Sequence, residues 1–128
     1  EGQRRECAVG AVPEEITALD VGEKTAERYS DSIAKAKTVF VNGPMGVFEQ
    51  AESELGTRAV FEALAKTSAY TVVGGGDSVT AAAKYAVTDQ LGYVCTGGGA
   101  LIRFLTGEEL PVDKALRHAA EKFGSREL

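Results

Sequence analysis

The chain has 128 residues, enough for one domain with a single hydrophobic core. Its net charge is −5, and its charged residues are scattered, without the basic stripe typical of nucleic-acid binding. No apolar stretch approaches the ~20 residues of a membrane span, and residues 1–6 lack the apolar core of a signal peptide. We therefore expect no nucleic-acid partner, no membrane contact and a cytoplasmic location.

Apolar runs rich in β-branched and aromatic residues predict short strands at four places in the chain. These strands cover residues 16–19, 38–41, 70–73 and 93–96. Apolar residues at helical spacing predict helices between and after the strands. The expected helices cover residues 23–37, residues 52–66, a segment capped by Asp77 or Ser78 that runs to Val87, residues 101–105, and a last segment capped by Asp113.

Strands that alternate with helices imply βαβ crossovers and a parallel sheet with helices on its faces. Short, wholly apolar strands agree with burial on both faces of such a sheet. The sequence therefore predicts an α/β fold of Rossmann-like type, with three αβα layers and a mostly parallel sheet. We expect it to form a single domain over residues 1–128.

Three glycine-bearing segments follow three of the predicted strands, at residues 42–49, 74–78 and 97–100. Ligands of open α/β sheets bind beyond the carboxyl ends of the strands, so these segments should meet in one crevice. Helix N-termini there would offer unpaired amides to phosphate, and the Asp77 carboxylate could hold magnesium. The segment 74–78 alone is equally compatible with a structural strand-to-helix turn; the convergence of three segments favours a ligand site.

Several other chemistries lack their sequence patterns. Neither G-x-G-x-x-G nor a Gly-Lys-Ser/Thr phosphate loop is present. The single histidine, His118, is expected on the surface of the last helix. Cys7 and Cys95 lie in strand-like apolar runs without metal-ligand spacing, and a strand-buried cysteine is usually unreactive.

Phosphoryl transfer fits the remaining features, because it depends on positioning and charge stabilisation rather than on a nucleophilic side chain. Asp77 would hold a metal, and backbone amides would hold phosphate oxygens. Such sites also use a lysine or arginine aimed at the phosphoryl group, and the three glycine segments contain neither residue.

The segments together resemble phosphoglycerate kinase. The resemblance rests on residues 39–49 (VFVNGPMGVFE), 74–78 (GGGDS) and 96–100 (TGGGA), supported by Gly56-Thr57 and by residues 107–111. It extends from about Ala18 to Leu116. It implies the later half of a C-terminal nucleotide-binding lobe, incomplete relative to the full lobe.

In that family, phosphate passes between 1,3-bisphosphoglycerate and ADP, with Mg²⁺ bound to ADP or ATP, in glycolysis and gluconeogenesis. Asp77 would bind magnesium, with Ser78 beside the phosphates. Gly97, Gly98 and Gly99 would supply amides to the transferred phosphoryl group. The resemblance also implies nucleotide contacts on several residues, namely Leu19 at the adenine, Asn42 at the phosphates, Pro44 and Val47 in the wall, Glu49 at the ribose, and Gly76 in the phosphate loop.

This sequence departs from the family pattern at Ala18, where glycine is common, and at residues 101–103, where Leu-Ile-Arg replaces the usual Ser-Leu-Glu. The lobe that binds 3-phosphoglycerate, the phosphate-binding lysine and part of the adenine pocket belong to other parts of the family's proteins. Our first hypothesis is therefore a piece of a kinase, inactive alone, which needs the remainder of the enzyme or self-associates.

Two alternatives remain open. The chain could be a free-standing, non-catalytic nucleotide-binding module, or a structural remnant that binds nothing. The first residue is Glu1 rather than Met, which favours a piece of a larger protein over the module. Asp77 and Glu49 are both present, which speaks against the remnant.

Overall fold

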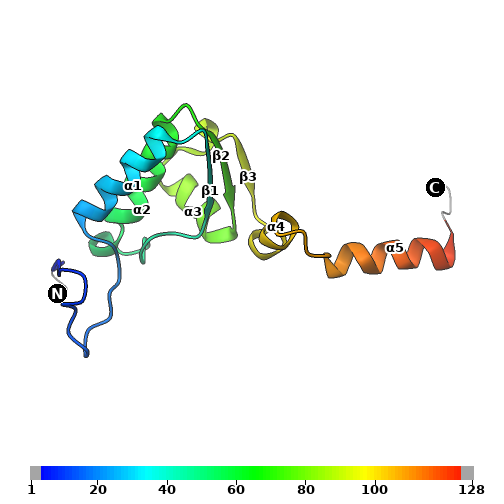
Figure 1. The fold of residues 1–128 in the computed structure, drawn as a ribbon, viewed down its shortest axis with the longest axis horizontal. Coiled ribbons are helices and arrows are strands. Elements are labelled where there is room, and N and C mark those ends of the chain that lie inside the picture. Colours follow the sequence, from blue (N-terminus) through cyan, green and yellow to red (C-terminus); the bar gives the residue numbers. More distant parts are fainter. Residues whose placement is uncertain (1–3, 125–128) are drawn as a thin grey trace.

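The computed structural model describes residues 4–124 of the chain. Strands and helices alternate through most of it, with two short 3₁₀ turns, η1 and η2 (Figure 1). In chain order the elements are α1 (Glu23–Lys35), β1 (Thr38–Asn42), η1 (Ala51–Ser53), α2 (Leu55–Lys66), β2 (Tyr70–Gly74), α3 (Gly76–Lys84), η2 (Thr88–Gln90), β3 (Tyr93–Cys95), α4 (Gly98–Leu105) and α5 (Pro111–Phe123).

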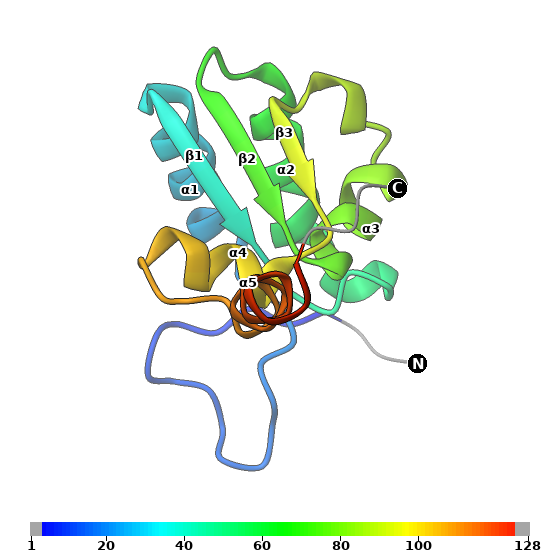
Figure 2. The same ribbon diagram turned by 90° about the vertical axis from the view of Figure 1, so that its right-hand side faces the viewer.

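The three strands form one parallel sheet in the order β1-β2-β3. Asn42 pairs with Gly74, and Gly74 pairs with Cys95, so the carboxyl ends of all three strands lie in one row. The predicted α/β class and parallel sheet are thereby confirmed. Figure 2 shows the segment before α1 at the same end of the sheet as these strand ends.

The core lies between the sheet and a layer formed by α1, α2 and α3 (Figures 1 and 2). Phe61 and Leu64 of α2 pack there with Val73 of β2, and none of the three is more than 1% exposed. Ala81 and Ala82 of α3 are also fully buried. The buried Phe61 ring of α2 lies with its centre 6.3 Å from that of the Tyr85 ring.

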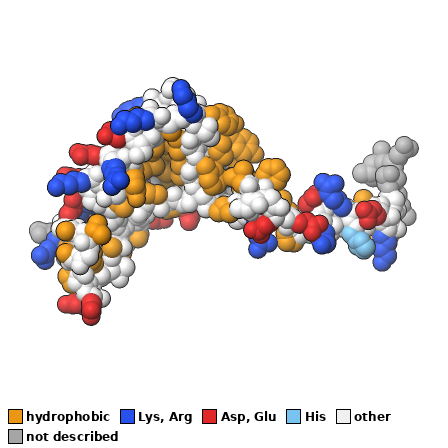
Figure 3. All heavy atoms as spheres, in the orientation of Figure 1, with side chains coloured by type: hydrophobic (Ala, Val, Ile, Leu, Met, Phe, Trp, Pro, Cys, Tyr) orange, Lys and Arg blue, Asp and Glu red, His pale blue; other side chains and the backbone are white. Residues whose placement is uncertain are grey.

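The opposite face of the sheet is largely uncovered. Phe40, Tyr70 and Tyr93 are 42–56% exposed there, and Figure 3 shows apolar side chains over this part of the sheet. The helix α4 lies against one end of this face, where Leu101 approaches Gly74. The amphipathic α5 extends away from the body, and almost all of its residues are exposed.

Several predicted features differ in the structure. Residues 16–19 form no strand, because no neighbouring strand pairs with them; Ile16 and Leu19 remain about half exposed. The predicted helix 52–66 is divided into η1 and α2. The last helix begins at Pro111, a residue favoured at this position, and Asp113 pairs with Arg117 at 2.8 Å instead of capping it.

None of the helices within residues 4–124 combines the length and apolar character that crossing a membrane requires.

Candidate functional site

The three glycine segments meet at the carboxyl ends of the strands. Gly75 donates its N–H to the Cys95 carbonyl at 3.0 Å, which joins the end of β2 to the end of β3. A Cβ placed on Gly75 would lie 3.3 Å from Asn42 Oδ1, and one on Gly98 would lie 3.1 Å from the same atom. Asn42 therefore lies where the ends of β1, β2 and β3 come together.

Gly75, rather than Asp77 or Ser78, occupies the N-cap of α3. Its φ of +95° lies in the region that favours glycine. Asp77 is in the first turn of α3 and exposed, so its carboxylate is accessible beside the unpaired amides of the helix N-terminus. Ser78 is fully buried, and its hydroxyl oxygen accepts the Gly43 N–H at 2.7 Å.

The N-terminus of α4 is the second helix end at this site. Gly97 is its N-cap and donates its N–H to Cys95 Sγ at 3.3 Å. Gly98 is closely packed, since an added Cβ would meet the Gly75 Cα at 3.0 Å, whereas Gly99 faces open space. The two helix N-termini thus approach each other closely at Gly75 and Gly98, with Gly99 accessible beside them.

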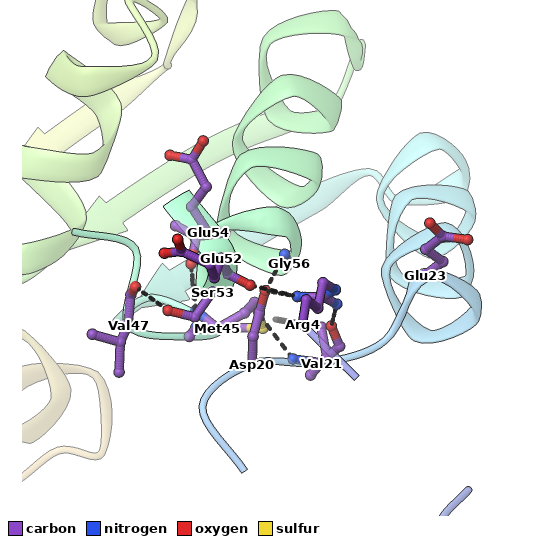
Figure 4. Close-up of polar contacts among 12 residues, drawn as sticks. Arg4, Asp20, Val21, Glu23, Met45, Val47, Glu52, Ser53, Glu54 and Gly56 are labelled. Atoms are coloured by element: carbon purple, nitrogen blue, oxygen red, sulfur yellow. Dashed lines mark hydrogen bonds and ion pairs between the residues drawn. The ribbon is translucent and has the colours of Figure 1, made fainter. Parts of the chain in front are cut away.

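The segment after β1, which covers residues 43–49, is held by side chains of α2 and η1. The buried Thr57 hydroxyl accepts the N–H groups of Met45 and Gly46 at 3.1 and 3.2 Å. The Ser53 hydroxyl donates to the Val47 carbonyl at 2.7 Å (Figure 4). Glu49, directly after the buried Phe48, is exposed.

Leu19 joins this segment from the other side, because its carbonyl accepts the Val47 N–H at 2.9 Å. Leu19 is 48% exposed and Val47 is 36% exposed, while Pro44 is half-buried. A cleft of about 560 Å³ opens beside Leu19, lined largely by residues of the segment before α1 and by η1. Neither Asp77 nor the glycines of α3 and α4 line it, so the cleft is separate from the phosphate-binding candidates.

Asp20 supports this end of the fold, a role not expected from its sequence position. Its side chain is 3% exposed and accepts the N–H groups of Val21 at 2.8 Å and Gly56 at 3.0 Å (Figure 4). Arg4 forms an ion pair with it at 3.1 Å. The sequence features that accompany this packing are Gly46 and Gly56, because a Cβ on either residue would lie within 2.6 Å of Asp20 Oδ1.

A second charged cluster links α2 to the end of α3. Lys84 Nζ is 2.7 Å from Glu54 Oε2, and Arg58 contacts the other Glu54 oxygen. Hydrogen bonds from Lys84 and then Arg58 hold the pKa of Glu54 below its ordinary value. Burial and the nearby Glu54 raise the pKa of Tyr85 to about 12, so its hydroxyl stays neutral at physiological pH.

The metal-binding capacity of the site rests on Asp77. Within residues 4–124, no group of three or more His, Cys, Asp or Glu side chains is placed to share a metal ion. Mg²⁺ in nucleotide sites often takes one or two carboxylates and completes its shell with phosphates and water. The exposed Asp77 beside two helix N-termini fits that mode of binding, and the site does not fit an all-protein metal cage.

Comparisons with known proteins agree with this geometry. The family model described as phosphoglycerate kinase matches residues 1–108. The phosphoglycerate kinases of Pyrococcus abyssi and Anaeromyxobacter sp. (strain K) are each 50% identical over 105 residues, 82% of this chain. Those residues are 25% and 26% of the two relatives, so the chain spans about a quarter of their length.

Two solved structures are similar to this chain in both fold and sequence. Phosphoglycerate kinase from Coxiella burnetii gives a TM-score of 0.67 at 49% identity, covering 75% of this chain and 25% of that one. Phosphoglycerate kinase from Pyrococcus horikoshii OT3 gives a TM-score of 0.69 at 46% identity, covering 81% and 25%. With a family model matched over most of its length and relatives half identical to it, this chain belongs to the phosphoglycerate kinase family.

Proposed function

We propose that this chain forms part of the nucleotide site of a phosphoglycerate kinase, which transfers a phosphoryl group between 1,3-bisphosphoglycerate and ADP. The observation that carries the proposal is the meeting of three glycine segments around Asn42, with the accessible Asp77 carboxylate beside them. A partial nucleotide-binding domain over residues 1–128 and a cytoplasmic location belong to the same proposal.

In this proposal the phosphates of ADP or ATP lie against the N-termini of α3 and α4. The first amides of each helix have no intrahelical partner and attract anionic oxygens. Gly76 begins α3, and Gly98 and Gly99 begin α4 after the N-cap Gly97. The N–H groups of Gly97 and Gly98 already donate to Cys95 Sγ and to the Thr96 carbonyl, so the phosphate contact proposed for α4 rests most directly on Gly99. Bound Mg²⁺ would neutralise phosphate charge, and Asp77 is the residue that would hold it.

The nucleoside would lie over the segment after β1. Glu49 would accept hydrogen bonds from the ribose hydroxyls, and Pro44, Val47 and Leu19 would contact the base. Asn42 would orient the phosphates. Ser78 would act through its hydrogen bond to the Gly43 N–H, which fixes the start of the segment.

Phosphoryl transfer in this site needs no general base from the chain. The acceptor carboxylate of 3-phosphoglycerate is already ionised near neutral pH. The three glycine segments carry no lysine or arginine, and Lys84, near one of them, is paired with Glu54. The acid substrate and a cation for the transferred group would therefore come from the remainder of the kinase.

A second candidate is non-catalytic nucleotide binding by this chain alone. It is favoured by the fact that hydrogen bonds within the chain hold the segment after β1, through Ser53, Thr57 and Ser78. A coupled assay of phosphoryl transfer separates the two candidates, since the module binds nucleotide and shows no turnover with or without the rest of a kinase.

Calorimetric titration of Mg-ADP into the chain tests the proposal. We expect Asp77→Ala to weaken Mg-ADP binding by about tenfold or more, because a charge-assisted metal contact is lost. Binding of ADP without magnesium should change little. Asp113→Ala is the matched control, since it removes an exposed carboxylate from α5. Equal Mg-ADP affinities for the Asp77 variant and the control would refute the assignment of the metal site.

A further inference from the structure

The last turn of α3 contacts the segment that carries Glu49. Lys84 Nζ donates a hydrogen bond to the Phe48 carbonyl and lies 5.8 Å from the centre of the Phe48 ring. Among residues 4–124, no backbone N–H reaches that carbonyl. Lys84 is therefore the donor that fixes the peptide joining Phe48 to Glu49.

Lys84 is itself held in place. Glu54 Oε2 lies 2.7 Å from Nζ, and the Tyr85 ring centre lies 5.7 Å away. The Glu54 carboxylate is only 13% exposed, and Arg58 contacts its second oxygen. The ammonium group thus has a defined position rather than the free rotation of a surface lysine.

The first turn of the same helix contacts the other end of the segment, where the Ser78 hydroxyl accepts the Gly43 N–H at 2.7 Å. A single helix therefore binds residues 43 and 48 of the segment after β1. Asp77 is adjacent in sequence to the first contact, and Glu49 is adjacent to the second.

We propose that Lys84 is a positioning residue, which fixes the ribose-side carboxylate of Glu49 relative to the metal-side carboxylate of Asp77. The rigid α3 sets the spacing between the two ends of a bound nucleotide. The identity of the ligand rests on the proposed function above, whereas the restraint on the segment is a property of the chain itself.

Hydrogen exchange measures the restraint without any ligand. In Lys84→Met we expect the amides of residues 47–50 to exchange about tenfold faster, as when one charge-assisted hydrogen bond is lost. The amides of β2 should keep their rates. Lys84→Arg should restore most of the protection, because it keeps a cationic donor. Lys66→Met is the matched control, since Lys66 is 78% exposed and its ion pair with Glu62 spans 3.9 Å.

Nucleotide selectivity measures the consequence. The chain should bind Mg-ADP more tightly than Mg-2′,3′-dideoxy-ADP, because only ADP offers hydroxyls to Glu49. Lys84→Met should reduce this preference to within about twofold while retaining the dependence on Asp77. If Lys84→Met proves unfolded, Glu54→Gln provides a milder variant, which should produce the same local exchange at smaller amplitude.

The outcomes distinguish the restraint on the segment from the identity of its ligand. A uniform rise in exchange across β2 and residues 47–50, or no rise in the segment, would overturn the positioning role. Unchanged selectivity in Lys84→Met, with wild-type preference intact, would also overturn it. Local exchange without nucleotide binding by the unmodified chain would uphold the restraint on the segment and refute nucleotide binding by this chain alone.

Discussion

Replacing Thr57 by valine isolates the hydrogen bonds that hold the segment after β1. The substitution preserves the side-chain shape and removes a hydroxyl oxygen that accepts two N–H groups, those of Met45 and Gly46. Thr57 is fully buried, so water cannot take its place at that position. The result is two backbone donors without their acceptor.

The expected loss follows from the burial of the two donors. An unsatisfied buried polar group costs about 1–3 kcal/mol. Both amides belong to half-buried residues, which places each near the lower end of that range. The free energy of unfolding should fall by about 2 kcal/mol, which corresponds to a decrease in Tm of roughly 8 °C for a domain of this size.

Urea unfolding monitored by circular dichroism provides the measurement. Thr80→Val is the control, because the exposed Thr80 hydroxyl only bonds the Gly76 carbonyl of its own helix; its effect should stay within about 0.5 kcal/mol. A Thr57→Val variant as stable as this control would refute the reasoning. Thr57→Ser, which keeps the oxygen, should recover part of the loss.

Three further predictions concern other parts of the fold. Gly75→Ala should lower the free energy of unfolding by about 1–3 kcal/mol, because Gly75 has a positive φ. Gly99→Ala should not lower it, because Gly99 lies at a helical position with open space around it. Urea titrations of the two variants in parallel provide the comparison. Glu54 has a lowered pKa in the folded state, so its stabilising contribution is present above its ordinary pKa of 4.5 and is lost as pH falls through the lower folded value. Glu54→Gln should therefore reduce the loss of folding stability that the chain shows on acidification. An unchanged loss in the variant would contradict this. The uncovered sheet face should drive self-association, so Phe40→Thr with Tyr93→Thr should shift sedimentation toward monomer; a wild-type chain that is monomeric at all concentrations would count against it.

The sequence by itself determined the features that depend on neighbouring residues. Apolar runs identified the strands at residues 38–41, 70–73 and 93–96, and helical spacing of apolar residues identified the helices around them. Both patterns are local, because burial in a sheet or on one helix face requires apolar residues at closely spaced positions. The glycine segments after three strands indicated where a site would form.

Tertiary structure decided what depends on partners distant in sequence. Residues 16–19 have the composition of a strand but lack a neighbouring strand, so their backbone stays irregular. Ser78 lies within the first turn of α3 instead of capping it, and its hydroxyl accepts the N–H of Gly43, 35 residues away. Lys84 contacts Phe48 across 36 residues, a pairing that no local pattern encodes. Such contacts arise only when parallel strands bring their carboxyl ends together, because this topology places the segments that follow them side by side.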